Sequence, residues 1–235
     1  MFKTVGASRY ISRESELPSA AEIPFVLKSP WSSSGRGIRY VLDKSHFSRN
    51  LSWAHSVIGQ QGGIMVEPFY NKVVDFAMEF EAKADETVVY RGLSLFLTKN
   101  GAYTGNLIAS EQEKRRILSE FVPEKVVDEL REAIVEVMTT ALQGCYIGPF
   151  GIDMMVVCDD SKNRGEKSEI ALHPCVELNL RRTMGHAALS IACDEAAPRV
   201  MSINYTDCHR LTIASADRNP YFPSSAVQSA YSSPN

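Results

Sequence analysis

One segment of the chain, HPCVELNLRR at His173–Arg182, alternates polar and apolar residues in the manner of a β-strand. Residues two apart in a strand point to the same face of the sheet. The polar face is predicted to carry Glu177, Asn179 and Arg181. The opposite face is predicted to point into the core with Val176, Leu178 and Leu180. A carboxylate, an amide and a guanidinium on one face are suited to hold a divalent cation next to a polyanion.

A second strand is predicted at Gly148–Val157, where a single carboxylate, Asp153, interrupts an apolar run. Oxygen ligands from two neighbouring strands are what Mg²⁺ takes when it also binds phosphates. Two carboxylates close together repel one another, and a bound cation removes that conflict. Asp153 and Glu177 are therefore candidate metal ligands. The alternative is that they are strand-end charges neutralised by Arg181 and Arg182.

A Ser- and Gly-rich loop lies between two short apolar strands within Phe25–Val41. Lys28 ends the first strand, while Gly35 and Gly37 let the backbone approach an oxyanion. Hydroxyl donors are added by Ser32, Ser33 and Ser34. The loop matches neither the Walker A motif nor the dinucleotide fingerprint, because no Gly-Lys-Ser/Thr follows and the third glycine of the fingerprint is missing. The pattern favours a phosphate-covering loop, and the alternative is a hairpin turn with an unrelated lysine.

The segment Gly62–Ala82 is predicted to contain two strands joined by a proline-bearing connector, Glu67-Pro68. The first strand is Ile64–Val66. Residues of the second strand alternate between its two faces. One face carries Phe76, Met78 and Phe80, and the other carries Ala77, Glu79 and Glu81. This arrangement is suited to a hinge between two lobes. Asp75, at the start of the second strand, is a candidate acceptor for ribose hydroxyl groups.

The remaining pattern predicts a helix at Ser45–Ile58, a hairpin at Tyr90–Ile108 around Asn100-Gly101, and a helix at Pro123–Gln143. Pro123 is expected in the first turn of that last helix. Its buried face is predicted to carry Val126, Val127, Leu130, Ile134, Val137, Met138 and Ala141. The chain beyond about Asn219 is rich in serine and proline and is predicted to be a loosely held tail.

Taken in this order, the pieces between Ala21 and Ala192 resemble the ATP-grasp superfamily of carboxylate–amine or carboxylate–thiol ligases. The resemblance implies an α+β fold in which two lobes with antiparallel sheets hold ATP between them. It also implies a reaction that depends on ATP and on Mg²⁺ or Mn²⁺. In that reaction a substrate carboxylate becomes an acyl phosphate, which an amine or a thiol then attacks.

The resemblance also assigns roles to residues of this chain. By this resemblance, the phosphates of ATP are bound by Lys28 and by the loop with Ser33, Ser34, Gly35 and Gly37. The residues expected to contact the base and ribose of ATP are Glu67, Pro68, Phe69, Asp75, Met155 and Val176. The expected metal ligands are Asp153, Glu177 and Asn179. Arg181 matches the arginine that stabilises the transferring phosphoryl group, so Arg181 and Lys28 are the candidate catalytic residues.

Three regions are expected: an N-terminal lobe at 1–66, a C-terminal lobe with the metal site at 67–215, and the tail at 216–235. Enzymes of this superfamily begin with a further α/β domain, for which too few residues precede Lys28. The chain is therefore expected to be truncated, with a partner chain or domain supplying the missing region. Besides a ligase acting on a small carboxylate and an amine, this leaves two alternatives: an ATP-binding module without chemistry of its own and a structural interaction domain.

Composition indicates a cytoplasmic protein that binds neither nucleic acid nor membrane. The 235 residues carry a net charge of −3 and the pI is about 6.0, which gives no electrostatic attraction for nucleic acid. No apolar run reaches membrane-spanning length. The five cysteines are scattered and odd in number, which favours reduced thiols. Two minor alternatives are a soft metal shared by His173 and Cys175, and an acid–base role for His186 near the substrate.

Overall fold

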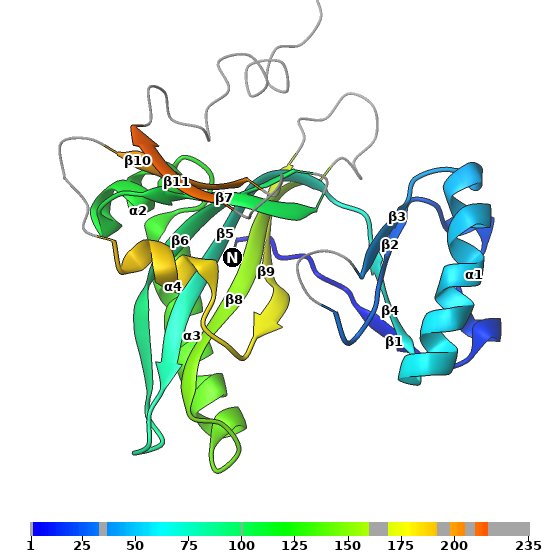
Figure 1. Cartoon of the computed structure of the whole chain (residues 1–235), viewed down its shortest axis with the longest axis horizontal. Coiled ribbons are helices and arrows are strands. Elements are labelled where there is room, and N and C mark those ends of the chain that lie inside the picture. The colour runs from blue at the N-terminus through cyan, green and yellow to red at the C-terminus, as the bar shows by residue number, and fades with distance from the viewer. Residues whose placement is uncertain are drawn as a thin grey trace, which may run out of the picture. The chain divides into compact units, whose positions relative to one another are not determined.

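The computed structural model describes residues 2–32, 37–99, 101–159, 169–191, 198–204 and 210–215. Ser33, Ser34, Gly35, the polar loop after residue 159, and the C-terminal tail lie outside these ranges. The chain divides into two compact units (Figure 1). The first is the chain up to Val73 with Thr98–Tyr103 and Val157–Pro174. The second is Val74–Leu97, Thr104–Val156 and the chain from Cys175 onward.

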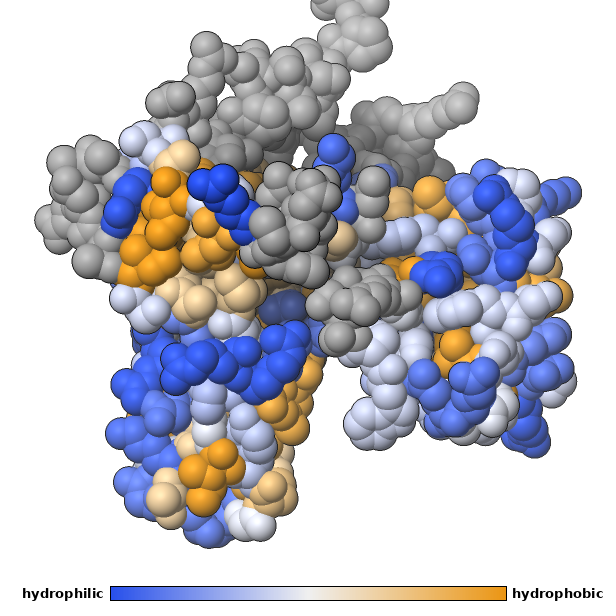
Figure 2. Space-filling model, in the orientation of Figure 1, coloured by the Kyte–Doolittle hydropathy of each residue, from blue (hydrophilic) through white to orange (hydrophobic). Residues whose placement is uncertain are grey.

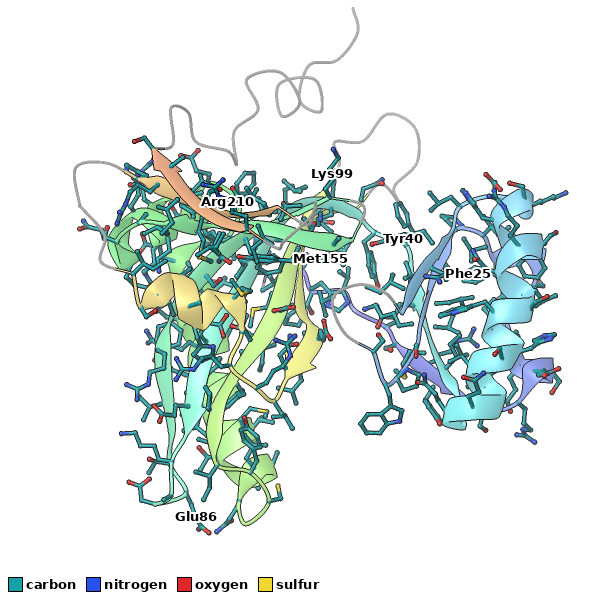
Figure 3. All side chains as sticks on the ribbon, viewed as in Figure 1. Phe25, Tyr40, Glu86, Lys99, Met155 and Arg210 are labelled. Carbon is teal, nitrogen blue, oxygen red and sulfur yellow. The ribbon has the colours of Figure 1, made fainter. Side chains whose placement is uncertain are left out.

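The first unit holds a four-stranded sheet in the order β1-β4-β2-β3. Its strands are β1 (Arg9–Ile11), β2 (Phe25–Lys28), β3 (Ile38–Val41) and β4 (Ile64–Pro68), all antiparallel to their neighbours. Two 3₁₀ turns, η1 (Glu14–Glu16) and η2 (Ala20–Glu22), connect β1 to β2. The helix α1 (Lys44–Gln61) packs on the sheet, and Phe25 points from β2 toward it (Figure 3).

The ends of α1 explain why the predicted helix at Ser45–Ile58 forms. Asp43 caps its first turn by accepting a hydrogen bond from the His46 N–H at 2.8 Å. Gly62 ends the helix in the left-handed conformation, with φ of 80°. Apolar residues of the helix and sheet form one core: Ile11, Phe25, Leu27, Val41, Ala54, Val57, Ile58, Ile64 and Val66.

The N-terminal segment is paired with residues from far along the chain. Thr4 forms a parallel bridge with Leu172, supported by a 2.9 Å hydrogen bond from the Val5 N–H to the Leu172 carbonyl. Lys3 forms an ion pair with Glu169 at 3.1 Å, across 166 residues of sequence. The chain's first residues are therefore ordered by a strand that comes much later.

A seven-stranded sheet, most of which belongs to the second unit, has the order β11-β10-β7-β6-β5-β8-β9. Its strands are β5 (Asn71–Ala82), β6 (Val88–Lys99), β7 (Ala102–Ile108), β8 (Gly148–Asp159), β9 (Glu169–Asn179), β10 (Arg199–Asn204) and β11 (Arg210–Ser215). The predicted hairpin around Gly101 is the β6–β7 pair. β5 and β8 lie inside the sheet, whereas β9 and β11 are its edges. Figure 2 shows apolar side chains at the surface near β10 and β11, where Leu211 and Ile213 are exposed.

Within the described ranges, the helices of the second unit are α2 (Glu111–Ser119), α3 (Glu124–Leu142) and α4 (Met184–Leu189). In the view of Figure 1, α4 crosses in front of the sheet and α3 lies behind it. Contacts agree with this, because Gly185 of α4 packs against Glu79 and Ser94, while Arg131 of α3 stacks on Tyr90. Over the ranges that the structure describes, no helix is long and apolar enough to span a membrane.

The burial of α3 differs from the prediction. The helix starts at Glu124. Pro123 is its N-cap residue and therefore lies just before the first turn, not within it as predicted. Its fully buried residues are Val127, Ile134, Met138 and Leu142. Val137 is 62% exposed and Ala141 is also exposed, so both were wrongly assigned to the core face. The predicted stripe was too wide, since a helix on one face of a sheet buries residues spaced by three or four only.

The orientation predicted for the end of β9 was also wrong. Leu178 and Leu180 are 41% and 45% exposed, whereas Asn179 is only 6% exposed. β9 is an edge strand and ends at Asn179. Near its end the structure describes no element that covers the leucine face. Of the polar face, Asn179 is buried and forms a hydrogen bond with Asp153 of the neighbouring strand β8, whereas Glu177 and Arg181 are exposed.

Candidate functional site

The predicted metal ligands on β8 and β9 come together in the second unit. Asn179 donates its side-chain N–H to Asp153 Oδ2 at 3.2 Å. Arg181, just beyond the end of β9, donates to Asn179 Oδ1 at 2.8 Å. A chain of polar contacts thus joins a carboxylate, an amide and a guanidinium from adjacent strands, as the alternating sequence pattern indicates.

Asp153 lies in a strongly anionic environment. Burial raises its pKa to about 7, and the nearby charges of Glu177, Glu79 and Asp75 add to this effect. The hydrogen bond from Asn179 opposes it. A carboxyl group whose pKa is raised by neighbouring carboxylates favours a bound cation, because the cation neutralises its charge without protonation.

The donor set fits a hard divalent cation that keeps water and phosphate ligands. It consists of the oxygens of Asp153, Glu177 and Asn179, and Mg²⁺ uses such oxygen ligands. No group of three or more His, Cys, Asp or Glu residues suited to a metal occurs within the described ranges. Two carboxylates and one amide are therefore what this part of the chain offers.

Arginines do not neutralise these carboxylates in the part of the chain that the structure describes. Arg181 binds the amide oxygen of Asn179 instead of a carboxylate. Arg182 is exposed, and its charge acts on Glu81 and His186. The alternative in which Asp153 and Glu177 are charges paired with the two arginines therefore does not describe this site.

In the first unit, Lys28 ends β2 and lies opposite Glu67 of β4. Lys28 Nζ is 2.5 Å from Glu67 Oε2, and the two side chains are 19% and 10% exposed. Glu67 also accepts a hydrogen bond from Ser8 Oγ at 3.3 Å. The lysine that the sequence assigns to phosphates is thus held at the end of its strand by a nearly buried carboxylate.

The base of the glycine-rich loop is closed by backbone contacts. The Ser29 N–H donates to the Gly37 carbonyl at 2.8 Å. A Cβ atom at Gly37 would lie 2.2 Å from Ser32 Oγ, so only glycine fits there. Ser29 Oγ and the Trp31 N–H both donate to Gln61 Oε1, at 2.8 and 2.9 Å. These contacts hold the start of the loop against the end of α1, and Ser29 joins the far end of the loop, at Gly37, to its start.

The segment Glu67–Phe69 is more regular than the predicted connector. Glu67 and Pro68 are the last residues of β4, where Pro68 is paired with Phe25. The Phe69 ring packs edge-on against Tyr40, with 6.2 Å between ring centroids. The prediction of a connector at Glu67-Pro68 was wrong because a proline is tolerated where a strand ends.

The predicted ATP residues fall into two groups, one in each unit. The first unit contains Lys28, Gly37, Glu67, Pro68 and Phe69. The second contains Asp75, Asp153, Met155, Val176, Glu177, Asn179 and Arg181. Met155 of β8 and Val176 of β9 are partly exposed, although Met154 and Val156 on either side of Met155 are fully buried. The partly exposed Met155 and Val176 side chains therefore suit contact with a flat apolar ligand.

Sequence reasoning missed a buried acid–base pair in the second unit. Glu79 of β5 is 1% exposed and His186 of α4 is 8% exposed. Glu79 Oε2 lies 2.8 Å from His186 Nδ1. The alternation in β5 suggested a half-buried strand, but β5 is internal and covered on both faces. The available signal was a glutamate within an otherwise apolar run.

His173 and Cys175 do not form the soft metal site considered from the sequence. His173 is 3% exposed and packs against Gly6 and the edge of the Tyr70 ring, whereas Cys175 is exposed. Burial lowers the pKa of His173, which favours the neutral ring. Neither ring nitrogen has a hydrogen-bond partner within the described ranges.

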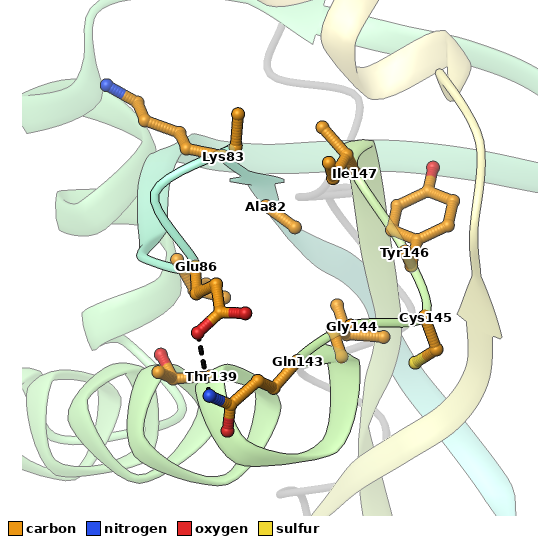
Figure 4. Close-up of a pocket in the computed structure, with 12 residues that line it drawn as sticks. Ala82, Lys83, Glu86, Thr139, Gln143, Gly144, Cys145, Tyr146 and Ile147 are labelled. Carbon is orange, nitrogen blue, oxygen red and sulfur yellow. Dashed lines mark hydrogen bonds between the residues drawn. The ribbon is translucent and has the colours of Figure 1, made fainter.

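A cavity of about 330 Å³ lies away from all the predicted site residues (Figure 4). It is formed by the β5–β6 turn and the end of α3, where Gln143 donates to Glu86 at 2.7 Å. Lys83, Cys145 and Tyr146 also line it. The cavity contains none of the carboxylates or amides of the metal-ligand group.

No protein-family model and no curated protein sequence matches the chain. Solved structures do. N5-carboxyaminoimidazole synthetase from Staphylococcus aureus, complexed with ADP, is similar with a TM-score of 0.53 and 14% identity, over 86% of this chain and 52% of that one. The biotin carboxylase domain of Hydrogenobacter thermophilus 2-oxoglutarate carboxylase gives 0.54 and 16%, over 86% and 47%. Rhizobium etli pyruvate carboxylase gives 0.52 and 14%, over 79% and 15%.

These similarities confirm the predicted fold class: the chain has the α+β ATP-grasp fold, with antiparallel sheets. The chain spans about half the length of the first two structures. At such low identity the likeness is one of fold, and what the chain binds or converts is a separate question.

Proposed function

We propose that this chain binds ATP with a divalent cation and is the nucleotide-binding part of a carboxylate-activating ligase. The observation that carries this proposal is a chain of contacts in an ATP-grasp fold. It runs from Asp153, in the middle of β8, through Asn179, at the end of the adjacent strand β9, to Arg181. The similar structures include proteins complexed with ADP or ATP, which supports a nucleotide as the ligand.

In the proposed reaction, an oxygen of a substrate carboxylate attacks the γ-phosphorus of ATP. The bond to the β–γ bridging oxygen breaks, giving an acyl phosphate and ADP. An amine then attacks the acyl carbon, loses a proton and expels inorganic phosphate. A thiol is the less favoured nucleophile. The identity of the carboxylate and of the amine is set by parts of the site that the nucleotide residues do not define.

Each residue contributes position or charge. Lys28 and the loop based on Gly37 would bind phosphates, with Ser33, Ser34 and Gly35 as further donors. Asp153, Glu177 and Asn179 would hold Mg²⁺ or Mn²⁺, which when bound neutralises phosphate charge. Arg181 would face the transferring phosphoryl group. Positioning and electrostatic stabilisation of this kind account for most of the catalysis in phosphoryl transfer.

The nucleoside would occupy the remaining predicted residues. The adenine would lie on Met155 and Val176 and meet the backbone of Glu67–Phe69, while Asp75 would accept hydrogen bonds from the ribose. Lobes at 1–66 and 67–215 and a tail at 216–235 remain our proposal for domain organisation. A reducing cytoplasmic location is proposed from composition and from the scattered cysteines.

A second candidate is an ATP-binding module that needs a partner chain or domain for catalysis. Phosphate release with candidate carboxylates and amines distinguishes the two. If the chain is a ligase, it releases phosphate without any partner. If it is a binding module, it releases phosphate only when the partner is added.

Thermal unfolding with Mg²⁺ and ATP, ATP alone and Mg²⁺ alone tests the shared part of both candidates. Ligand at about 100 times its Kd adds about 2.7 kcal/mol of stability, which raises the Tm by roughly 5–10 °C for a chain of this size. The rise is expected to need both ligands and to vanish in Lys28→Ala and Glu177→Ala. Glu132→Ala, on the exposed face of α3, is the matched control and should keep it. No rise in the wild type would refute nucleotide binding.

A further inference from the structure

A second cavity, of about 250 Å³, lies between β6, β7 and the helices α2 and α4. Its lining residues all belong to the second unit and include none of the residues proposed to bind ATP or the metal. The apolar part of its wall is formed by Leu93, Leu107, Ile108, Ala109, Ala188 and Leu189. The volume is just below the range of about 300–1,000 Å³ that holds drug-sized ligands, so the cavity suits a smaller molecule.

A buried lysine lines this cavity. Lys114 of α2 is 3% exposed, and its Nζ donates to the Leu93 carbonyl at 2.6 Å. The same nitrogen lies 3.2 Å from Glu111 Oε2. An ammonium group carries three hydrogens, and within the described ranges these two acceptors take two of them. The third hydrogen of a nearly buried cation is costly to leave without an acceptor.

The position of Lys114 has a structural reason, which uses only part of its ammonium group. Glu111 Oε2 accepts from the Leu93 N–H at 3.0 Å, while Lys114 donates to the Leu93 carbonyl. Both backbone polar groups of Leu93 are thus satisfied by side chains of α2. Glu111 Oε1 accepts from the Tyr90 hydroxyl at 2.7 Å. Both oxygens of Glu111 are therefore already engaged, and Lys114 compensates its charge.

A buried serine is the second donor in the lining. Ser94 is 3% exposed, and its Oγ accepts from Asn106 Nδ2 at 2.6 Å. Asn106 is fully buried and also donates to the Leu95 carbonyl at 3.3 Å, which fixes the amide. Because the Ser94 oxygen accepts from this amide, its own O–H is left to donate.

The buried polar side chains thus meet a ligand mainly as donors. Lys114 and Ser94 each have one hydrogen to give, whereas the oxygens of Glu111 already accept. Arg91, also in the lining, is exposed and pairs with Glu81 at the surface. A molecule that complements this wall must therefore supply an acceptor oxygen, together with an apolar part for the aliphatic side chains.

We propose that this cavity binds a small apolar molecule that carries one carbonyl or carboxylate group. The oxygen of that group accepts from Lys114 and Ser94, and the hydrocarbon part packs on Leu107, Ile108 and Leu189. An amine does not bind, because it would bring further donors and a second positive charge beside Lys114. This site goes beyond the proposed nucleotide function and does not depend on it.

Methyl NMR of the whole chain, labelled at isoleucine, leucine and valine, tests the site directly. The probes are isovalerate, isovaleramide and isoamylamine, which share one branched carbon skeleton. The two probes with a carbonyl oxygen should shift the methyl signals of Ile108, Leu189 and Ile191 until saturation, and isoamylamine should not. The tighter of the two identifies the group as a carboxylate or a neutral carbonyl. Ile147, which lines the other cavity, is the internal control and should not shift.

Variants of the two donors test how the probe is recognised. Lys114→Met should weaken the binding of the tighter probe about tenfold. Lys125→Met, at an exposed position of α3, is the matched control and should leave the affinity unchanged. If Lys114→Met does not fold, Ser94→Ala decides, because Asn106 keeps its bond to the Leu95 carbonyl. That variant should weaken binding roughly fivefold.

Three results would overturn the proposal. Isoamylamine binding as tightly as the other probes, or a donor variant with the affinity of the wild type, would show that donors do not select the ligand. An absence of any shift at Ile108, Leu189 and Ile191 would mean that the cavity holds only water. Each of these results is independent of ATP binding, because none of the probes is a nucleotide.

Discussion

The ammonium group of Lys28 lies 2.5 Å from the carboxylate of Glu67, between two neighbouring strands and largely out of solvent. Removing one partner leaves the other charge buried and uncompensated, which typically costs 3–5 kcal/mol. Lys28→Met and Glu67→Gln should therefore each lower the free energy of unfolding by about 3 kcal/mol in urea titrations.

The control for this pair is an exposed one. Lys125 and Glu129 lie 3.7 Å apart on α3 with side chains 85% and 62% exposed. Lys125→Met should cost less than about 1 kcal/mol, because surface pairs contribute little. Equal effects at the two sites would mean that burial does not control the strength of the Lys28–Glu67 pair.

Asp153 predicts how stability and cation binding depend on pH. Its pKa is raised from 3.8 to about 7 in the fold. The folded state therefore holds an extra proton between about pH 4 and 7, so stability falls as pH rises through this window and is level above it. Asp153→Asn should remove that fall, whereas Asp128→Asn, at an exposed ion pair, should not.

Divalent cation should reverse the effect of pH. Mg²⁺ binds the ionised carboxylate, so its stabilisation of the protein should grow from pH 6 to 8 and disappear when EDTA is added. Thermal unfolding at fixed Mg²⁺ concentration across that range measures it. A stabilisation independent of pH would place the cation away from Asp153.

Two glycines should respond in opposite directions to the same substitution. Gly185→Ala forces a methyl group to within 1.9 Å of Glu79 Oε1 and should cost about 2 kcal/mol or more. Gly59 lies within α1, where an added methyl group would meet no described atom within 4 Å beyond the backbone of its own helix. Gly59→Ala should therefore stabilise the protein by about 0.5–1 kcal/mol in urea titrations. Destabilisation by Gly59→Ala would contradict the open space at that position.

Trp31 should report on the glycine-rich loop. Its side chain is 80% exposed while its backbone is fixed to Gln61. If the loop binds phosphates, Mg²⁺ with ATP should change the tryptophan fluorescence, and Trp31→Phe should abolish the change. Trp53→Phe, which removes the partner of Arg39, should retain it. A signal that survives in Trp31→Phe would come from elsewhere than the loop.

The sequence predicted the order and type of most elements, because local signals were strong. Alternation, caps and an Asn-Gly turn are properties of neighbouring residues, so β2, α1, the β6–β7 hairpin and α3 could be located without tertiary information. The contact between Asn179 and Asp153 followed from the expectation that two adjacent strands supply the ligands of one metal site.

What the sequence did not predict depends on which strand lies where in the sheet. Leu178 and Leu180 are exposed because β9 is an edge, and Glu79 is buried because β5 is internal. The same alternating pattern produces either result. Strand order is a long-range property, and the partner of Glu79 lies more than a hundred residues away, at His186.

The pairing of Thr4 with Leu172 has a consequence for synthesis of the chain. Lys3 meets Glu169 across 166 residues, which takes a ribosome roughly 10–30 s at about 5–20 residues per second. The first segment of the chain therefore remains unpaired until β9 has been synthesised. The contact between Gly6 and His173 can form only after that. Contacts this distant in sequence slow folding, so we expect the N-terminal segment to pair later than the strands and helix that follow it in the first unit.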